Sequence, residues 1–393
     1  MTKPSTEDCI AWLDRLIAFD TTSRNSNMAL IEDVRGHLDA LGFATRLTHD
    51  ETGTKANLWA TVGPTDRGGV VLSGHTDVVP VDGQDWTSDP FKLDRRGGKL
   101  FGRGTADMKG FVAVCVAHAE RMASSDLKTP LHFAFSYDEE VGCTGVQGMI
   151  DDMIENLPMP LAVIVGEPTS MQIVGGHKGG RGFNVTVTGV DGHSSDPDAG
   201  ANAIFAAARI VNFLEGLQER FRAEADPANG FEPPFTTVNV GTIGGGTAHN
   251  IIPAECRLLT SFRNTPEVDA DEIEAMIRAF IADEIEAGLK RVSPDAGVRV
   301  ETALSLPPLA PDEDSAAERL LRHLTGLNRS GRVSYGTEAA RFQAVGVPGV
   351  VFGPGSIDQA HRPDEWIEVD QIAQCNAFLA DLTDWATRHE GIA

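Results

Sequence analysis

The amino-acid sequence predicts an α/β protein, a doubly wound and mostly parallel sheet interrupted by a smaller α+β domain of ferredoxin-like order. Apolar strand patterns alternate with helical patterns over the first half of the chain. Such alternation is typical of a parallel sheet covered by helices on both faces. The pattern changes at the glycine-rich residues 178–182, and the alternation resumes after the proline-rich residues 306–311.

The larger domain is expected to comprise residues 1–179 and 306–393, on the basis of hydrophobic periodicity. Its first helix, at 5–19, has apolar residues at helical spacing behind a Ser/Thr cap signal. The next helix, at 28–41, is closed by Gly42. Strands are expected at 44–48, 57–62, 70–73, 131–136, 162–165 and 349–352, and further helices at 110–122, 315–324 and 369–389.

The inserted domain is expected at residues 180–305. Its first strand, at 183–189, alternates between apolar and polar residues as a half-buried strand does. The order strand–helix–strand–strand–helix–strand is that of two helices on one face of an antiparallel sheet. The remaining elements are a helix at 199–222, strands at 236–243 and 251–262, a helix at 269–289 and a strand at 298–304.

Composition indicates a soluble globular protein. The chain has 393 residues, too many for one ordinary core, with 41% hydrophobic and 23% charged residues. Its net charge of −24 argues against nucleic acid and anionic membranes as partners. Five scattered cysteines without a CxxC pair suit a reducing compartment. With neither a signal-peptide pattern nor a long apolar run, the sequence predicts a cytoplasmic protein.

Acidic residues and a histidine follow three of the expected strands. His75 follows strand 70–73 after Gly74, Glu139 and Glu140 follow strand 131–136, and Glu167 follows strand 162–165. In open α/β sheets, ligands gather outside the carboxyl ends of the strands. Crowded carboxylates repel one another unless a cation holds them, and imidazole with carboxylate is a ligand set suited to zinc. The sequence therefore predicts a metal-dependent hydrolase.

Two further residues reach the same region. Asp107 follows a glycine-rich stretch and precedes a helix, so it could cap that helix or bridge two metals with its two oxygens. His361 lies in a loop after strand 349–352. A lone loop histidine usually has no special role, but a two-metal site needs another nitrogen ligand.

The other candidates also have structural interpretations. His75 and Asp77 face the same way on an extended segment, either as a ligand with its supporting carboxylate or as a surface pair. The apolar residues on both sides of the pair favour the ligand. Glu139 and Glu140 point to opposite sides, so one could bind a metal while the other acts as general base, or both could form a solvated turn. Glu167 could be an exposed cap, but loops after buried strands commonly carry function.

Motifs of other catalytic classes do not occur. The sequence contains no HExxH, no GxxxxGK[ST] and no GxSxG. The glycines at 244–246 lead into a strand and not a helix, so they form no dinucleotide-binding fingerprint.

Five motifs in order resemble the family of co-catalytic zinc amidohydrolases and metallopeptidases. This family includes acetylornithine deacetylase, succinyl-diaminopimelate desuccinylase, aminoacylases and glutamate carboxypeptidases. The resemblance covers nearly the whole chain and implies two divalent metal ions, zinc first and cobalt as the alternative. The motifs are residues 73–80, 102–110, 138–142, 166–169 and 360–365.

The resemblance implies a role for each metal ligand. Asp107 is implied to bridge the two metals. His75 and Glu167 would complete one metal site, and Glu140 and His361 would complete the other.

It also implies the residues that support the chemistry. Asp77 would support His75, and Glu139 would be the general base. The peptide bond between Asp107 and Met108 is expected to be cis.

The inserted domain is implied to contribute to catalysis and assembly. His193 resembles the histidine that reaches the active site of a partner subunit, which implies a homodimer through residues 180–305. Asn250 and Arg263 match positions that contact substrate in the family.

Within the family, four segments look most like the acetylornithine deacetylases: 138–143, 335–340, 353–356 and 361–366. This likeness implies a small N-acyl amino acid as substrate, with hydrolysis of N2-acetyl-L-ornithine to L-ornithine and acetate in arginine biosynthesis. The enzymatic alternatives are a related N-acyl-amino-acid deacylase, a succinyl-diaminopimelate desuccinylase or a glutamate carboxypeptidase. The non-enzymatic alternative is a metal-binding scaffold protein.

Overall fold

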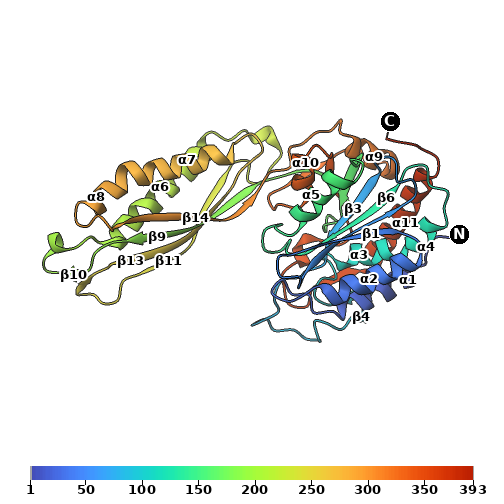
Figure 1. The fold of residues 1–393 in the computed structure, drawn as a ribbon, viewed down its shortest axis with the longest axis horizontal. Coiled ribbons are helices and arrows are strands. Elements are labelled where there is room, and N and C mark those ends of the chain that lie inside the picture. The colour runs from blue at the N-terminus through green and yellow to red at the C-terminus, as the bar shows by residue number, and fades with distance from the viewer. Residues whose placement is uncertain (1, 393) are drawn as a thin grey trace. The chain divides into compact units, whose positions relative to one another are not determined.

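A computed structural model describes residues 2–392, which form two compact units (Figure 1). The larger unit comprises Met1–Gly176, Ala310–Gly331 and Thr337–Ala393. The smaller unit comprises His177–Leu309 and Arg332–Gly336. The sequence pattern gave no sign of the short return segment to the smaller unit.

The larger unit is built on a sheet with the strand order β1-β2-β6-β3-β7-β16-β8-β15. Its central strands β6, β3, β7 and β16 are parallel, whereas β1, β2 and β8 pair antiparallel with their neighbours. The predicted fold class, a mostly parallel sheet in a mixed α/β protein, is confirmed. The strands are β1 (Ala44–His49), β2 (Ala56–Val62), β3 (Val70–His75), β6 (Leu131–Ser136), β7 (Ala162–Val165), β8 (Val174–His177), β15 (Gly331–Val333) and β16 (Gly349–Val351).

Helices cover both faces of this sheet (Figure 1). Helices α1, α3 and α11 form one group and pack against one another. Helices α5 and α10 form a second group and pack against each other and against strands of the sheet. Val70 and Leu72 of β3 belong to the core of the first group, whereas Val71 points to the opposite face. The helices are α1 (Thr6–Ile17), α2 (Met28–Ala40), α3 (Lys109–Ala117), α4 (Ala119–Ala123), α5 (Val146–Asn156), α9 (Ala316–Thr325), α10 (Ala339–Ala344) and α11 (Val369–Ala386).

Helix α1 shows how the sequence produces these elements. The Ser5 hydroxyl accepts from the backbone N–H of Asp8, and the Asp8 carboxylate accepts from the backbone N–H of Ser5. This reciprocal cap satisfies two N–H groups that the helix itself cannot pair. Leu13, Leu16 and Ile17 are fully buried on the inner face. Each such side chain contributes about 1.5–3 kcal/mol by leaving water.

The larger unit differs from the expected elements in two ways. The expected helix at 110–122 is divided at His118, whose ring Nε2 lies 2.7 Å from Asn376 Oδ1 of α11. Several short elements were not expected, because three to eleven residues carry a weak periodic signal. They include helices α5 and α10 and a separate small sheet of β4 (Asp94–Arg96), β5 (Lys99–Phe101) and β17 (Trp366–Glu368).

The smaller unit is an antiparallel sheet with the strand order β11-β13-β9-β14. Helices α6 and α7 lie side by side, with the rings of Phe213 and Phe280 stacked 4.1 Å apart. This agrees with the expected order of elements. They are β9 (Gly180–Thr188), β10 (Gly192–His193), α6 (Ala203–Ala223), β11 (Thr237–Gly245), β12 (Ile251–Ile252), β13 (Glu255–Arg263), α7 (Ala270–Phe280), α8 (Ala287–Lys290) and β14 (Gly297–Leu306).

Two boundaries in the smaller unit differ from the prediction. The expected strand at 251–262 is two strands, β12 and β13, and Pro253 lies between them. A proline lacks the N–H that a continuous ladder requires. Helix α6 begins at Ala203 and not at 199, because the Asn202 side chain accepts from the Phe205 N–H and caps it there.

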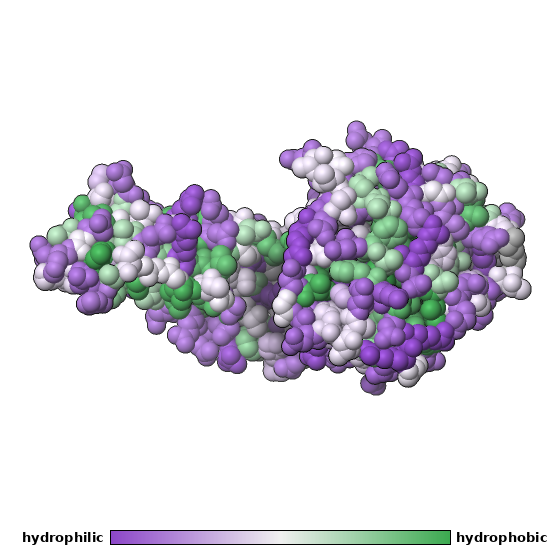
Figure 2. Space-filling view, turned by 90° about the horizontal axis from the view of Figure 1, so that it is seen from below, coloured by the Kyte–Doolittle hydropathy of each residue, from purple (hydrophilic) through white to green (hydrophobic). Residues whose placement is uncertain are grey.

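The surface is mainly hydrophilic, with separate apolar patches on both units (Figure 2). Five of the most exposed large apolar side chains belong to the smaller unit: Phe205, Ile243, Ile251, Leu259 and Val292. Among residues 2–392, no helix combines the length and apolar character that a membrane crossing needs.

Candidate metal centre

Three parallel strands end at the same edge of the larger sheet and bring predicted site residues there. His75 is the last residue of β3, Glu139 lies three residues beyond β6, and Glu167 lies two residues beyond β7. Strand β3 pairs with both β6 and β7. The three residues therefore meet at the edge where α/β sheets bind ligands.

Asp107 lies at the centre of the cluster. Its Oδ1 is 3.0 Å from His75 Nε2, and its Oδ2 is 3.3 Å from His361 Nε2. The residue is 5% exposed, and the peptide bond between Asp107 and Met108 is cis. One carboxylate thus presents a different oxygen to each of two histidines, an arrangement that suits a ligand shared by two ions.

Each histidine also faces a glutamate. His75 Nε2 is 3.6 Å from Glu167 Oε1, and His361 Nε2 is 2.9 Å from Glu140 Oε2. The structure therefore brings together all five predicted metal ligands. Glu139 is equally close, since its carboxylate and possible ligand atoms of His75 and Glu167 all lie within 4.8 Å of one another. Distance alone does not separate the predicted base from the predicted ligands.

Burial and mutual repulsion make it unfavourable for all the glutamates of the cluster to be ionised at once. Burial, together with Asp107, raises the pKa of Glu140 to about 7 and that of Glu167 well above its usual range. Burial, with Glu140 and Glu338 nearby, raises the pKa of Glu139 to about 8. Positive charge among these carboxylates would remove this cost.

The histidines supply that charge by holding protons. Hydrogen bonds to Asp107 and Glu140 raise the pKa of His361 to about 10. Burial would lower the pKa of His75, but Glu167 and Asp107 outweigh it and raise the pKa. Burial would raise the pKa of Asp107, but the two histidines hold it well below its usual range.

This donor set fits two divalent cations. It offers two imidazole nitrogens and several carboxylates around one shared aspartate, which are ligand types that zinc takes. A divalent ion between each histidine and its carboxylates would supply the positive charge that protons otherwise provide.

Asp77 holds several of these groups in place. Its backbone oxygen is 2.9 Å from His75 Nδ1. Its carboxylate accepts from the backbone N–H groups of Glu139 at 3.1 Å and Glu140 at 3.3 Å, and from the Ser23 hydroxyl at 2.7 Å. The sequence predicted the support of His75, but the contacts with the two glutamates were missed, because they depend on how the turn after β6 folds.

Two further residues of the site were also missed. The Cys143 thiol donates to Glu139 Oε1 at 3.0 Å, because the turn from 139 to 143 folds back through a hydrogen bond from Cys143 N to Glu139 O. Glu338 is 1% exposed and accepts from the Ser73 hydroxyl at 3.3 Å. Burial raises the pKa of Glu338 to about 7. The only sequence signal was that Cys143 and Glu338 occur in segments that resemble the family.

The three predicted residues of the insert lie in the smaller unit. His193 and Asn250 are neighbours, since the Ser194 N–H donates to the Asn250 backbone oxygen and His193 pairs with Ile251. Arg263 is exposed at the other end of β13, opposite Thr237. Within this unit, Arg263 therefore does not come together with the other two.

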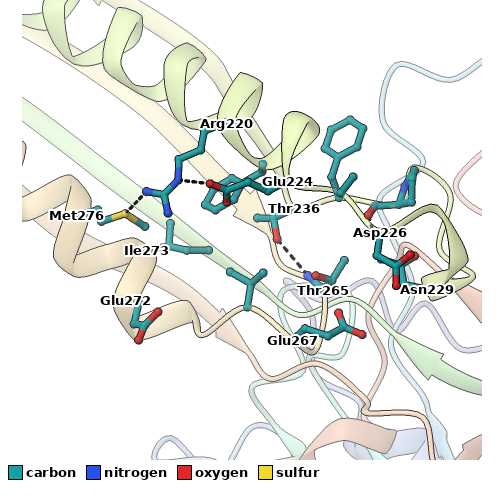
Figure 3. A pocket seen from close by; sticks show the side chains of 15 residues that line it. Arg220, Glu224, Asp226, Asn229, Thr236, Thr265, Glu267, Glu272, Ile273 and Met276 are labelled. Atoms are coloured by element: carbon teal, nitrogen blue, oxygen red, sulfur yellow. Dashed lines mark hydrogen bonds and ion pairs between the residues drawn. The ribbon is translucent and has the colours of Figure 1, made fainter.

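A cavity of about 330 Å³ in the smaller unit is distinct from this cluster (Figure 3). Arg220 pairs there with Glu224 at 2.9 Å and also contacts the Met276 sulfur. The Thr265 N–H donates to the Thr236 hydroxyl. None of the residues that line it is a predicted ligand or base, so the cavity is not the metal centre.

The sequence from residue 71 to 384 matches the model of Peptidase family M20/M25/M40. The chain belongs to this family. It is a hydrolase that acts on amide bonds. Similar curated proteins include an acetylornithine deacetylase of Myxococcus xanthus, 38% identical over 94% of this chain and 95% of that protein. Another acetylornithine deacetylase, from Proteus mirabilis, is 36% identical over 93% of this chain and 92% of that protein.

Solved structures of the family share the fold. A metallo-carboxypeptidase of Sulfolobus solfataricus has a TM-score of 0.76 at 16% identity and covers 97% of this chain and 99% of its own. A tripeptidase of Staphylococcus aureus has a TM-score of 0.74 at 18% identity, and the match covers 99% of this chain and 100% of the tripeptidase. A dinuclear metal-binding peptidase of Bacillus subtilis has a TM-score of 0.64 at 15% identity and covers 96% and 98%. The family and the donor set together indicate two divalent metal ions.

Proposed function

We propose that this M20 hydrolase is an acetylornithine deacetylase, which converts N2-acetyl-L-ornithine to L-ornithine and acetate in arginine biosynthesis. The observation that carries the proposal is Asp107, with one carboxylate oxygen on each of two histidines and a glutamate beside each histidine. Curated relatives of that name span more than nine-tenths of this chain and of their own length, which supports this substrate.

The ligands divide into two sets around one shared residue. His75 and Glu167 would hold one ion, Glu140 and His361 would hold the other, and Asp107 would serve both. We assign zinc to both sites, with cobalt as the alternative, because nitrogen and carboxylate oxygen are ligands that zinc takes readily. When bound, the ions lower the pKa of a water molecule and polarise the amide carbonyl.

Glu139 moves the proton in this account. Its carboxylate lies among the ligands, and its backbone is fixed by the carboxylate of Asp77. It takes a proton from the attacking water and returns it to the nitrogen of the leaving amine, acting first as base and then as acid.

We also assign substrate contacts to three residues of the smaller unit. Arg263 would hold the substrate carboxylate as a fork of two N–H donors, and His193 would stabilise the oxyanion that forms at the amide carbon. Asn250 would contact the substrate. Arg263 is the last of the nine residues of β13. The first residue of this strand lies roughly 26 Å away, at about 3.3 Å per residue. His193 lies beyond that start, so one small substrate cannot touch His193 and Arg263 of the same smaller unit.

This separation supports a homodimer through residues 180–305, in which His193 serves the partner's site. The smaller unit has a groove of about 750 Å³ lined in part by Phe205, Ile251 and Val292. Phe205 is 71% exposed and shares this groove with the exposed Ile251 and Val292, and a contiguous apolar patch of this kind marks an interaction site. Strand β11 of the same unit is an edge of its sheet, where a second copy could pair.

The oligomeric state tests the dimer. Phe205→Asp should shift the protein toward monomer in light scattering after size-exclusion chromatography. Ile154→Asp, which replaces a side chain that is 47% exposed on the larger unit, is the matched control and should remain dimeric. A monomeric parent protein would refute this part of the proposal.

The cysteines support a cytoplasmic location. Cys9, Cys115, Cys143, Cys256 and Cys375 are all free and buried. Such a set is typical of a reducing compartment.

A panel of N-acyl amino acids tests the substrate. The purified protein should hydrolyse N2-acetyl-L-ornithine with a higher kcat/KM than N-succinyl and N-formyl amino acids or dipeptides. A clear preference for the N-succinyl substrate or for a dipeptide would replace the proposed substrate while leaving the metal chemistry intact.

A further inference from the structure

The carboxylate of Glu365 organises the loop that carries Asp107. Glu365 is 1% exposed and accepts four hydrogen bonds. Its Oε1 accepts from the backbone N–H groups of Ala106 at 2.9 Å and Asp107 at 3.1 Å. Its Oε2 accepts from the Gly104 N–H at 3.0 Å and from the Arg103 guanidinium at 2.8 Å. One side chain therefore fixes three backbone groups next to the predicted shared ligand.

Arg103 extends this contact to the loop that carries His361. Its side chain is also 1% exposed and lies over the ring of Trp86, 5.0 Å from the centroid. It donates to the Arg362 backbone oxygen at 3.3 Å and to the Gln84 side-chain oxygen at 2.6 Å. The Gln84 amide in turn donates to the His361 backbone oxygen at 2.9 Å. The loops of Asp107 and His361 are thus joined by a chain of polar contacts, in which the Arg103–Glu365 pair is buried.

The backbone around His361 requires such contacts. His361 has φ +63° and Asp364 has φ +53°, in the left-handed region that residues other than glycine rarely adopt. Each such residue costs roughly 1 kcal/mol or more and persists where its surroundings fix it. Asp364 is held by the Thr87 N–H and hydroxyl, at 2.9 and 3.0 Å.

A purely structural role does not explain this arrangement well. A buried ion pair is often no more stabilising than apolar residues of the same size, since both charges lose their water. The partners of Glu365 are also specific, because they are the N–H of Asp107 itself and of residues just before it. Glu365 lies only four residues after His361.

We propose that Glu365, with Arg103, is a positioning residue that presets the distance between the Asp107 carboxylate and the His361 imidazole. It thereby sets the affinity for the ion that these two ligands share with Glu140. This inference rests on the metal assignment in the proposed function. The affinity for the ion assigned to His75 and Glu167 should depend less on Glu365, because His75 is fixed by β3 and Asp77.

Glu365→Gln tests the inference in the full-length protein. The glutamine keeps the size of the side chain but turns an amide NH2 toward donors, so two of the four contacts are lost. Titration of chelator-treated protein with Zn²⁺ should show the first ion binding as in the parent. The second ion should bind roughly 10- to 100-fold more weakly, as is usual when a group that orients a ligand is lost. The visible absorption of the Co²⁺-loaded protein should change mainly at the second equivalent.

Glu368→Gln is the matched control, since Glu368 is exposed and lies three residues further along the chain. It should bind both ions as the parent does. Should Glu365→Gln fail to fold, Gln84→Ala replaces it, because Gln84 is only half-buried and its loss should weaken the second ion in the same direction.

Two results would overturn the inference. One is a folded Glu365→Gln protein that binds both ions with the parent's affinities and only unfolds at a lower temperature. The other, if that variant does not fold, is an unchanged second-ion affinity in Gln84→Ala. Failure of the parent protein to bind two ions is a separate result, which would reject the proposed function.

Discussion

Asp77 illustrates how much of the site depends on single residues. Its backbone oxygen contacts the ring of His75, and its carboxylate holds the turn that presents Glu139 and Glu140. The sequence placed Asp77 beside His75, because both belong to one extended segment. The contact with the turn after β6 joins residues about 60 apart, which no local pattern predicts.

The two adjacent glutamates should differ in function. Glu139→Gln keeps the shape of the side chain but cannot take a proton. It should therefore retain both ions and lose kcat by at least ~10²-fold. Glu140→Gln should instead lose the ion that it shares with His361. Metal analysis and steady-state kinetics on both variants measure this difference. If Glu139→Gln loses metal while Glu140→Gln keeps it, the two roles are exchanged.

Cys143 should act through Glu139. The thiol contributes one hydrogen bond to the Glu139 carboxylate, and such a bond is worth about 0.5–1.5 kcal/mol. Cys143→Ala should lower kcat by roughly 3- to 10-fold with little change in KM, and Cys143→Ser should restore most of the loss. Cys375→Ala, at another buried cysteine, is the control. Equal losses in Cys143→Ala and Cys143→Ser would show that the hydroxyl does not replace the thiol contact.

At the level of elements, strands with a clear apolar run were predicted well and short elements were not. Strands β3, β6 and β7 are buried along their whole length, so apart from His75 and His132 their sequences consist of apolar or small residues. By contrast, β4, β5 and β17 have three residues each and depend on one another for pairing. The division at Pro253 could have been predicted, because proline interrupts a ladder.

Strand β6 carries a pH-dependent part of the stability. His132 is buried against Trp59, and burial lowers its pKa to about 4. The unfolded chain, with a histidine pKa of about 6.5, takes up the proton first as the pH falls. The stability that comes from burying His132 in its neutral form is therefore fully present above pH ~6.5 and is lost between about pH 6.5 and 4. Between pH 7.5 and 5 the free energy of unfolding should fall by about 2 kcal/mol from this cause.

His132→Phe removes the titrating group and keeps a ring beside Trp59. In urea unfolding, the free energy of unfolding should fall between pH 7.5 and 5 by about 2 kcal/mol less in the variant than in the parent protein. Parallel losses in the two proteins would contradict the assignment of this pH dependence to His132.

For the whole molecule, the order of elements was sufficient to predict an inserted α+β unit in a doubly wound sheet. Repeated alternation of helix and strand was the signal, and it survived errors of several residues at individual boundaries. The position of Arg263 relative to His193 could not be predicted in the same way, because it depends on the register of β9 and β13.

That separation leads to a prediction for mixed dimers. His193→Ala and Glu139→Gln should each be nearly inactive alone. Coexpression should restore activity in hybrid dimers, where one site takes its base from the His193→Ala chain and its histidine from the Glu139→Gln chain. Random pairing makes about a quarter of all sites intact in a two-fold dimer. Purified hybrids that remain inactive would show that His193 does not act on a partner's site.

We propose that this chain hydrolyses an N-acyl amino acid with two ions held around Asp107. The most direct test is to remove metal with a chelator and to follow hydrolysis of N2-acetyl-L-ornithine while Zn²⁺ is added back. Activity should be absent without metal and should return as the protein takes up to two ions per chain. Full activity in the metal-free protein would contradict this proposal.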